Sequence, residues 1–457
     1  MVDETITKEE LLARAKKPAA DAMRLHHYYR GKTQTALRCP VRGLGDFAIW
    51  YTPGVAAPCR AIAEDPGLVY EYTSKWNTVA VISDGTRVLG LGDIGPKAGL
   101  PVMEGKALLY KYLGGVDAVP ITLDTKDPDE IIRTVLMLQP AFGGVNLEDI
   151  AQPKCFRILD TLREHAEIPI WHDDQQGTAS VVLAGLINAA KVVGKSLKDM
   201  RIAFIGAGAA NVACSRLIFA YGVDPSNCVM VDINGILGKH RRDIYMRRSE
   251  FVQQWYLCQF TNGEEIEGGV EEALRGADAV IAFSTPGPGV IKPEWVKTMA
   301  KDAIVFAGAN PIPEIWPWEA KEAGAVVMAT GRSDFANQVN NSLCFPGIFR
   351  GTLDVRATTI TDEMAIAASV ALAETAEEKG LSPDYILPPM TEWQLFPHLA
   401  AVVAMKAQEQ GLTQLPEPIT YEDEYQRATE MIKASREATE IMMRDGLIPA
   451  APESDEE

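Results

Sequence analysis

Apolar and polar positions in the first third of the chain follow a strand–helix–strand rhythm. The three stretches are VDAVPITL (116–123), DEIIRTVLMLQ (129–139) and FGGVNLEDI (142–150). Helical patterns also cover residues 7–30 and 103–114. Residues 78–90 are typical of a hairpin, with two apolar strands and an Asp84-Gly85 turn. Together these patterns predict an α/β domain.

A second α/β unit is predicted from about residue 175. A helix rich in small residues leads to a strand, a tight glycine loop and a helix (201–222), and three more strands follow, at 228–232, 278–283 and 302–307. This order predicts a Rossmann-like domain. Two further helical stretches, 361–380 and 396–411, are expected to return to the first domain. We therefore predict an N-terminal substrate and metal domain (1–172), a nucleotide-binding domain (173–340) and a C-terminal helical segment packed on the first domain (341–457).

Composition narrows the possible partners. The 457 residues are 47% hydrophobic and carry a formal net charge of -18, which argues against nucleic acid and anionic membranes as partners. No apolar run approaches the ~20 residues that span a bilayer, and the charged N-terminus is unlike a signal peptide. The seven cysteines form no CxxC pair. These features predict a cytoplasmic protein with reduced thiols.

Two glycine loops compete for the role of nucleotide site. Gly90-Leu-Gly92-Asp-Ile-Gly95 matches GxGxxG in full, whereas Gly206-Ala-Gly208-Ala-Ala-Asn211 lacks the third glycine. The first loop runs into Pro96 and Pro101, so we expect no helix to begin promptly there. The second follows a strand and enters a helix, whose N-terminus would bind phosphate. We therefore assign the nucleotide to Gly206, Ala207, Gly208, Ala209 and Ala210, and a structural role beside the active site to the 90–95 loop.

An acid in the expected place accompanies the second loop. Asp232 lies 21 residues beyond Asn211 (232 − 211) and is expected to accept hydrogen bonds from the ribose. Such an acid repels a 2′-phosphate, so NAD is favoured over NADP. The basic run 239–242 could neutralise a phosphate instead, although we interpret it as solvated surface.

Two pairs of acids, each flanked by apolar residues, predict a further site. Glu148-Asp149 ends the stretch NLEDI, and Asp173-Asp174 lies in IWHDDQQGTAS. Isolated buried acids are costly, so such clusters usually hold a cation or carry out proton chemistry. Helix caps and loop ends are the alternative interpretation.

Seven blocks, in order, resemble the malic enzymes of the short bacterial and archaeal type. They are WYTPGVA (50–56), RVLGLGDIGPKAGLPVMEGKALLYK (87–111), NLEDI (146–150), HDDQQGTA (172–179), IGAGAANVA (205–213), GANP (308–311) and NQVNNSLCFPG (337–347). As a set they are specific and cover most of the chain from about 50 to 347. Asp93 replaces an Asn expected in this type.

The resemblance implies a role for each matching residue. Tyr51 would be the general acid and Lys106 the general base, with Asp173 supporting Lys106. The metal ligands would be Glu148, Asp149 and Asp174. Arg87 would bind a substrate carboxylate, and Asn310 and Asn341 would contact substrate and nicotinamide. The resemblance also suggests a homodimer or higher homo-oligomer, in which Tyr51 would serve the neighbouring subunit.

The implied reaction is oxidative decarboxylation of malate to pyruvate with NAD or NADP. Three carboxylates, two substrate oxygens and a water make six hard ligands, which suit Mg²⁺ or Mn²⁺. Burial and a nearby cation are expected to lower the pKa of Lys106. We interpret His172 as structural support. One alternative keeps the metal and cofactor but carries out non-redox decarboxylation of oxaloacetate or acts on another hydroxy acid. The other is a non-catalytic nucleotide-sensing or interaction protein on the same fold.

Overall fold

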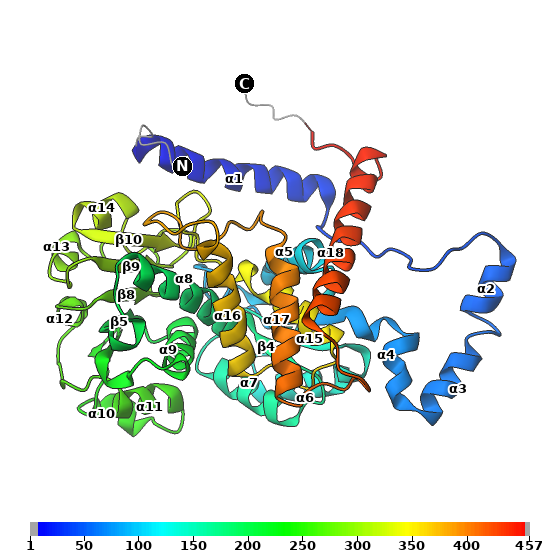
Figure 1. Ribbon diagram of the computed structural model, residues 1–457, viewed down its shortest axis with the longest axis horizontal. Coiled ribbons are helices and arrows are strands. Elements are labelled where there is room, and N and C mark those ends of the chain that lie inside the picture. The colour runs from blue at the N-terminus through cyan, green and yellow to red at the C-terminus, as the bar shows by residue number, and fades with distance from the viewer. Residues whose placement is uncertain (1–7, 453–457) are drawn as a thin grey trace.

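The computed structural model describes residues 8–452. Its N-terminal region comprises three helices, α1 (Lys8–Tyr29), α2 (Leu44–Trp50) and α3 (Ala56–Glu64). Helix α1 agrees with the predicted helix, apart from residue 7, which lies outside the described residues. Figure 1 shows α2 and α3 standing off from the body on one side. Neither helix buries any of its residues, so this arm (residues 37–64) adds nothing to the core of its own chain.

The first sheet is entirely parallel, in the order β2-β1-β3-β4. Its strands are β1 (Thr78–Ser83), β2 (Asp117–Thr122), β3 (Gly144–Leu147) and β4 (Ile170–His172). The chain reaches it through η1 (Pro66–Leu68), α4 (Val69–Tyr72) and η2 (Ser74–Asn77), and α5 (Gly95–Gly114), α6 (Pro128–Leu138) and α7 (Lys154–His165) connect its strands. The hairpin predicted over 78–90 is wrong. Only a single antiparallel bridge, Val88 to Gly92, forms there, because β1 pairs with β2 and β3 instead.

A second prediction, that no helix begins promptly after the first glycine loop, is also wrong. Helix α5 begins at Gly95, directly after the first glycine loop, although we expected the prolines to delay it. Pro96 lies in the first turn, where a backbone N–H has no helical partner, so its missing donor costs nothing. The helix ends at Gly115, whose φ of 63° is the left-handed conformation that favours glycine.

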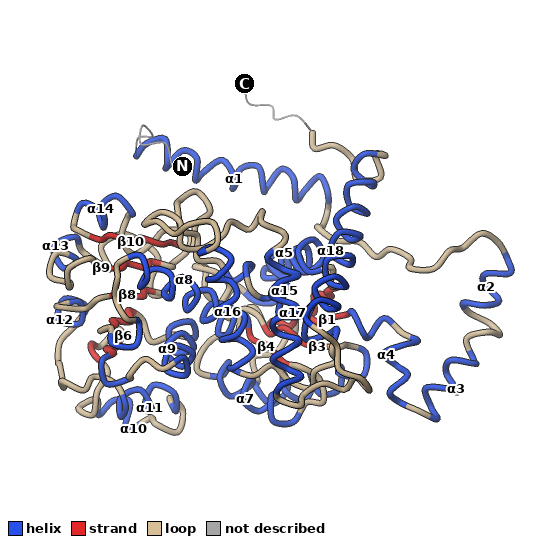
Figure 2. The backbone as a smooth tube through the Cα atoms, in the orientation of Figure 1, coloured by secondary structure: helices blue, strands red, loops and turns tan. Residues whose placement is uncertain are grey.

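The second sheet has the order β10-β9-β8-β5-β6-β7, parallel except for β7. Its strands are β5 (Ile202–Ile205), β6 (Cys228–Asp232), β7 (Gly235–Ile236), β8 (Ala279–Ala282), β9 (Ala303–Ala307) and β10 (Ala325–Thr330). The helices are α8 (Thr178–Val192), α9 (Ala209–Tyr221), α10 (Arg242–Met246), α11 (Val252–Phe260), α12 (Val270–Leu274), α13 (Pro293–Val296) and α14 (Pro317–Glu322). This arrangement confirms the Rossmann-like prediction. Figure 2 shows the strands as two separate groups.

The C-terminal segment forms four helices, three of which return to the first domain, in line with the predicted fold. They are α15 (Phe345–Asp354), α16 (Asp362–Glu377), α17 (Leu395–Glu409) and α18 (Tyr421–Arg444). Helices α15, α17 and α18 contact α5, whereas α16 packs against α8 and α9. Among the described residues, no helix is long and apolar enough to span a membrane.

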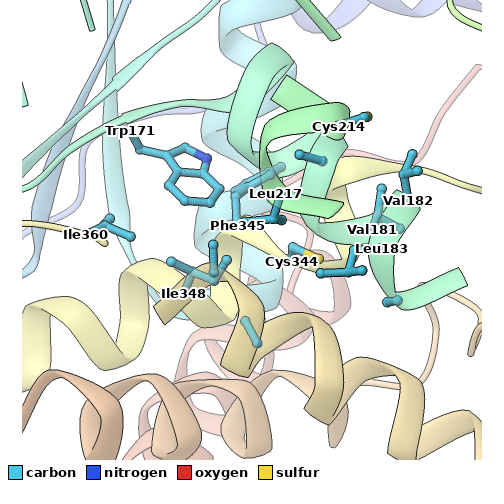
Figure 3. Packing of buried hydrophobic residues seen from close by; sticks show 14 of the residues in the cluster. Trp171, Val181, Val182, Leu183, Cys214, Leu217, Cys344, Phe345, Ile348 and Ile360 are labelled. Atoms are coloured by element: carbon cyan, nitrogen blue, oxygen red, sulfur yellow. The ribbon is translucent and has the colours of Figure 1, made fainter. Parts of the chain in front are cut away.

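One hydrophobic cluster joins the two sheets. Figure 3 shows Trp171 of β4 close to Phe345 and Ile348 of α15, with Val181 of α8 and Leu217 of α9 in the same cluster. Every residue of α15 is buried. Full burial of a large apolar side chain contributes roughly 1.5–3 kcal/mol. Because this one cluster contains residues of both sheets, its packing holds the two sheets together.

Candidate active site

Strand register brings the two acid pairs together. In the first sheet Leu147, the last residue of β3, pairs with His172, the last residue of β4. Glu148-Asp149 and Asp173-Asp174 follow these two residues directly. Because the strands are parallel neighbours, both pairs emerge at the same carboxyl edge, where α/β sheets bind ligands.

Backbone geometry then turns the acids toward one another. Asp149 has φ 55°, a left-handed conformation that non-glycine residues seldom adopt and that is frequent at functional sites. Asp173 to Gly177 form a single π-helical turn between β4 and α8. A Cβ at Gly177 would lie 1.9 Å from Oδ1 of Asp173, so only glycine leaves room for that carboxylate.

Glu148, Asp149 and Asp174 can provide three oxygen ligands to one cation. One carboxylate oxygen from each lies within 4.8 Å of the others. Glu148 and Asp149 are buried, and Asp174 is partly buried. The backbone N–H of Asp149 donates to Oδ2 of Asp174 at 2.7 Å, which ties the two segments together.

The electrostatics of these acids fit a bound cation. Burial raises the pKa of all three carboxyl groups, and the negative charge of Asp174 raises that of Glu148 and Asp149 further. Oδ2 of Asp149 is buried and has no hydrogen-bond partner among the described residues. A divalent cation would satisfy this oxygen and balance the charge, and three carboxylates are the hard donors that Mg²⁺ or Mn²⁺ prefers.

Lys106 of α5 lies beside the acids with 7% of its side chain exposed. Its Nζ is 2.5 Å from Oδ2 of Asp173 and 3.0 Å from Oε1 of Glu148, and it lies 4.5 Å from the centroid of the Phe345 ring. Burial lowers the pKa of Lys106, but the two carboxylates outweigh burial, so the pKa is raised. The lowering expected from burial together with a bound cation stays a prediction, because the raised pKa reflects the protein's own charges alone.

Three residues that support the site were missed from the sequence. The Tyr110 hydroxyl donates to Oδ1 of Asn146 at 2.8 Å, and Nδ2 of Asn146 donates to Oε2 of Glu148 at 2.8 Å. Nε1 of Trp171 donates to Oδ1 of Asp173 at 2.9 Å. The spacing of these residues could have identified them. Tyr110 is four residues after Lys106 on a helix, Asn146 is two residues before Glu148, and Trp171 is two residues before Asp173.

His172 is fully buried, and neither ring nitrogen has a hydrogen-bond partner among the described residues. Burial lowers the pKa of His172 to about 4, so its ring is neutral. This agrees with a structural role for His172 and does not favour it as a base.

The three substrate-binding candidates come from three separate segments of the chain. The backbone N–H of Arg87 donates to the carbonyl oxygen of Asp149 at 3.0 Å. The Cβ of Asn341 is 3.2 Å from the position that a Cβ on Gly177 would take, so Asn341 borders the π-helical turn. Asn310 follows β9, at the carboxyl end of the second sheet.

Tyr51 is not brought to this site in its own chain. It ends α2, is 73% exposed, and belongs to the arm that stands off from the body in Figure 1. Asp93, at the position expected to be Asn, forms an ion pair with Lys126, 2.6 Å from it.

The second glycine loop has the form of a dinucleotide site. Gly206 has φ 101°, and a Cβ on it would lie 2.5 Å from the carbonyl oxygen of Phe283. A Cβ on Gly208, by contrast, would meet nothing within 4 Å, so there is space above the N-terminus of α9 for a pyrophosphate.

Two side-chain amides hold this loop, those of Asn211 and of Gln254, and the sequence analysis did not single out Gln254. Nδ2 of Asn211 donates to the carbonyl oxygens of Ile205 and Gly206, at 2.8 and 2.9 Å. The Asn that replaces the third glycine therefore braces the turn. Nε2 of Gln254 donates to Ala207 and to Gln152, which precedes α7, and so links the loop to the first sheet.

Asp232 ends β6, as predicted, but it already has a partner. Arg241 donates to both of its carboxylate oxygens, at 2.8 and 2.7 Å, and also to Asp243. Arg241 is buried, so the interpretation of the basic run as solvated surface is wrong for this residue, although its three neighbours in the run are exposed.

A dinucleotide loop and a cluster of carboxylates at the edges of two linked α/β sheets fit a nicotinamide-dependent oxidoreductase. Comparison with known families gives the finer class. Residues 34–163 match the malic enzyme N-terminal domain, and residues 175–408 match the malic enzyme NAD-binding domain. The chain belongs to the malic enzyme family, whose reaction is the oxidative decarboxylation of malate.

Several relatives are similar over most of their length. The bifunctional malic/malolactic enzyme of Bacillus subtilis is 48% identical over 86% of this chain and 94% of its own. The NAD-dependent malic enzyme of Geobacillus stearothermophilus is 50% identical over 84% and 78%. Among solved structures, the malic enzyme of Entamoeba histolytica has a TM-score of 0.94 at 48% identity, covering 99% of this chain and 94% of its own.

Proposed function

We propose that this chain converts L-malate to pyruvate and CO2 with NAD as the oxidant and Mg²⁺ or Mn²⁺ as the metal. The observation that carries this assignment is the convergence of Glu148, Asp149 and Asp174 around one point, with the Lys106–Asp173 pair in contact with them. A bound cation would polarise the C2 oxygen of malate, and the nicotinamide would accept the hydride from C2.

Lys106 and Asp173 form the proton-transfer pair. Oxidation at C2 releases the hydroxyl proton, which Lys106 takes up as its own proton passes to Asp173 across the 2.5 Å contact. The C3–C4 bond then breaks and CO2 leaves. The electron pair of the broken bond remains on the enolate of pyruvate. Protonation at C3 completes the product, and Tyr51 is the proposed acid.

The position of Tyr51 supports a homodimer in which each arm completes the neighbouring site. The arm exposes large apolar side chains that its own chain does not cover: Leu44, Phe47, Ile49, Trp50 and Tyr51. A contiguous exposed apolar surface of this kind marks a protein interface. A second copy of the chain is the proposed partner, because its Tyr51 is likewise exposed on an arm.

NAD is favoured over NADP by the environment of Asp232. A 2′-phosphate needs a cation with free donors, but the Arg241 guanidinium already binds both Asp232 and Asp243. The next residue, Ile233, is 96% exposed and offers an apolar side chain to any added phosphate. Comparing kcat/KM for the two coenzymes tests this, and a preference for NADP would refute it.

A product assay tests the reaction itself. Malate, NAD and Mn²⁺ should give equal amounts of NADH and pyruvate, and a chelator should abolish both. Lactate without net NADH would instead indicate the malolactic reaction, which the name of the Bacillus subtilis relative includes. Tight NAD binding with no product of either kind would favour the non-catalytic alternative. We also place the chain in the cytoplasm, where its seven free cysteines, five of them buried, would stay reduced.

A further inference from the structure

The first glycine loop forms a tight turn that is anchored to the acid cluster. Residues 87–92, here called the Gly90 loop, begin with the hydrogen bond from Arg87 to Asp149 described above. The turn is closed by hydrogen bonds from Val88 to Gly92, at 2.9 Å, and from Leu91 to Val88, at 3.0 Å. The tip of the loop is therefore held at a fixed position relative to Asp149.

The tip of the loop touches the second sheet at Asn310. A Cβ on Gly90 would lie 2.4 Å from the carbonyl oxygen of Asn310, 3.1 Å from Cγ of Pro286 and 3.3 Å from Cδ of Pro311. Gly331 encloses the same residue from another side, because a Cβ there would lie 2.6 Å from Nδ2 of Asn310. Two glycines thus border Asn310 so closely that neither position has room for a side chain.

The contact, and not the backbone conformation, requires glycine at position 90. Gly92 has φ 77°, so its own dihedral favours glycine, whereas Gly90 is not among the residues with positive φ. An alanine at 90 would be free of backbone strain. Its methyl group would nevertheless force apart the Gly90 loop and Asn310, since carbon and oxygen atoms do not approach to 2.4 Å.

We propose that Gly90 is a positioning residue that sets the distance between the acid cluster and the nicotinamide side of the site. The loop connects Asp149, a proposed metal ligand in the first sheet, to Asn310, at the carboxyl end of β9. This inference rests on the proposed function. It predicts that hydride transfer, which spans the two sheets, depends on Gly90 more strongly than decarboxylation, which needs only the acid cluster and Lys106.

Two activities of one variant test the proposal. Gly90→Ala should lower kcat for malate oxidation by about 10- to 100-fold, because a displacement of about 1 Å at a reacting centre costs up to about 100-fold. Mn²⁺-dependent decarboxylation of oxaloacetate, measured with NAD present, should change by less than about threefold. The kinetic isotope effect with malate deuterated at C2 should rise, because hydride transfer becomes slower than the other steps.

Leu91→Ala is the matched control. It lies in the same loop, is 68% exposed, and leaves the Gly90 contact intact, so both activities should stay at the wild-type level. Thermal unfolding of each variant reports on folding. If Gly90→Ala failed to fold, Pro286→Ala, which removes a wall of the same contact without adding bulk, should lower the oxidation-to-decarboxylation ratio to a smaller extent.

The outcomes separate this inference from the proposed function. A wild-type protein without malate oxidation refutes the proposed function and, with it, the role of Gly90. An active wild type whose folded Gly90→Ala variant keeps normal oxidation, or loses both activities equally, overturns the role of Gly90 alone.

Discussion

A mixed dimer tests whether Tyr51 acts in the neighbouring subunit. Tyr51→Phe removes the proposed acid, and Lys106→Ala removes the proposed base. Each homodimer should lose about 10²- to 10⁴-fold in kcat, the typical contribution of general acid–base catalysis. Because the exposed arm places Tyr51 away from the Lys106 of its own chain, a dimer with one variant of each kind should regain activity.

The expected recovery follows from counting sites. In the mixed dimer, the Tyr51→Phe chain keeps Lys106 and receives an intact Tyr51 from its partner. The other site lacks both groups. One of two sites is complete, so a C2-symmetric dimer should regain about half of the wild-type kcat. The mixed dimer is isolated by co-expressing the two chains with different affinity tags and purifying on both tags in turn.

A reciprocal pairing provides the control. In this control, a wild-type chain is combined with a Tyr51→Phe/Lys106→Ala chain. If Tyr51 acts in the partner, each site of this dimer lacks one of the two groups, so the dimer should be nearly inactive. If Tyr51 acts within its own chain, this pairing keeps about half of the activity and the first mixed dimer has none. That reversed pattern would refute the reasoning, as would a monomer in solution.

Three further substitutions examine the site and the core. Asp174→Asn should weaken Mn²⁺ binding, measured by titration calorimetry, and an unchanged affinity would exclude Asp174 as a ligand. Tyr110→Phe leaves Oδ1 of the buried Asn146 without its donor, so the free energy of unfolding in urea should fall by about 1–3 kcal/mol, and an unchanged value would contradict that contact. Burial and the neighbouring Asp354 raise the pKa of Glu424, whose carboxyl group is fully buried. The folded state therefore holds a proton that the unfolded state releases above its ordinary pKa of 4.5, and stability is lost as pH rises from there. Glu424→Gln should raise the free energy of unfolding at pH 7 by on the order of 1–3 kcal/mol and flatten its pH dependence, whereas a destabilised variant at that pH would contradict the shift.

Local sequence pattern was sufficient to predict most helices and strands and the type of chemistry. The strand, glycine loop and helix of residues 201–222 identified the nucleotide loop because each is determined by neighbours in sequence. The acid pairs could be singled out because carboxylates beside buried strands are rarely without function. The misplaced hairpin at 78–90 shows where local pattern fails, since its two apolar stretches were correct but the partner strands of β1 come from elsewhere in the chain.

The hydrogen bonds that support the acid cluster could not be predicted from local sequence pattern. The chain from Tyr110 through Asn146 to Glu148 joins a helix to a strand 36 residues away, and only the packed fold shows which amide faces which acid. The effect of neighbouring carboxylates on the pKa of Lys106 could not be predicted from the sequence for the same reason. Its direction depends on the number of charged oxygens within a few ångströms, which is a property of the tertiary structure.

What the sequence alone determined is the set of residues and the class of chemistry, because hydrophobic periodicity and motif spacing are properties of short segments. The tertiary structure decided which of these residues meet. Parallel register brought the two acid pairs to one edge, and a shared hydrophobic cluster held the two sheets together. It also left Tyr51 exposed on an arm, because an apolar segment with no surface to cover in its own chain stays outside the core.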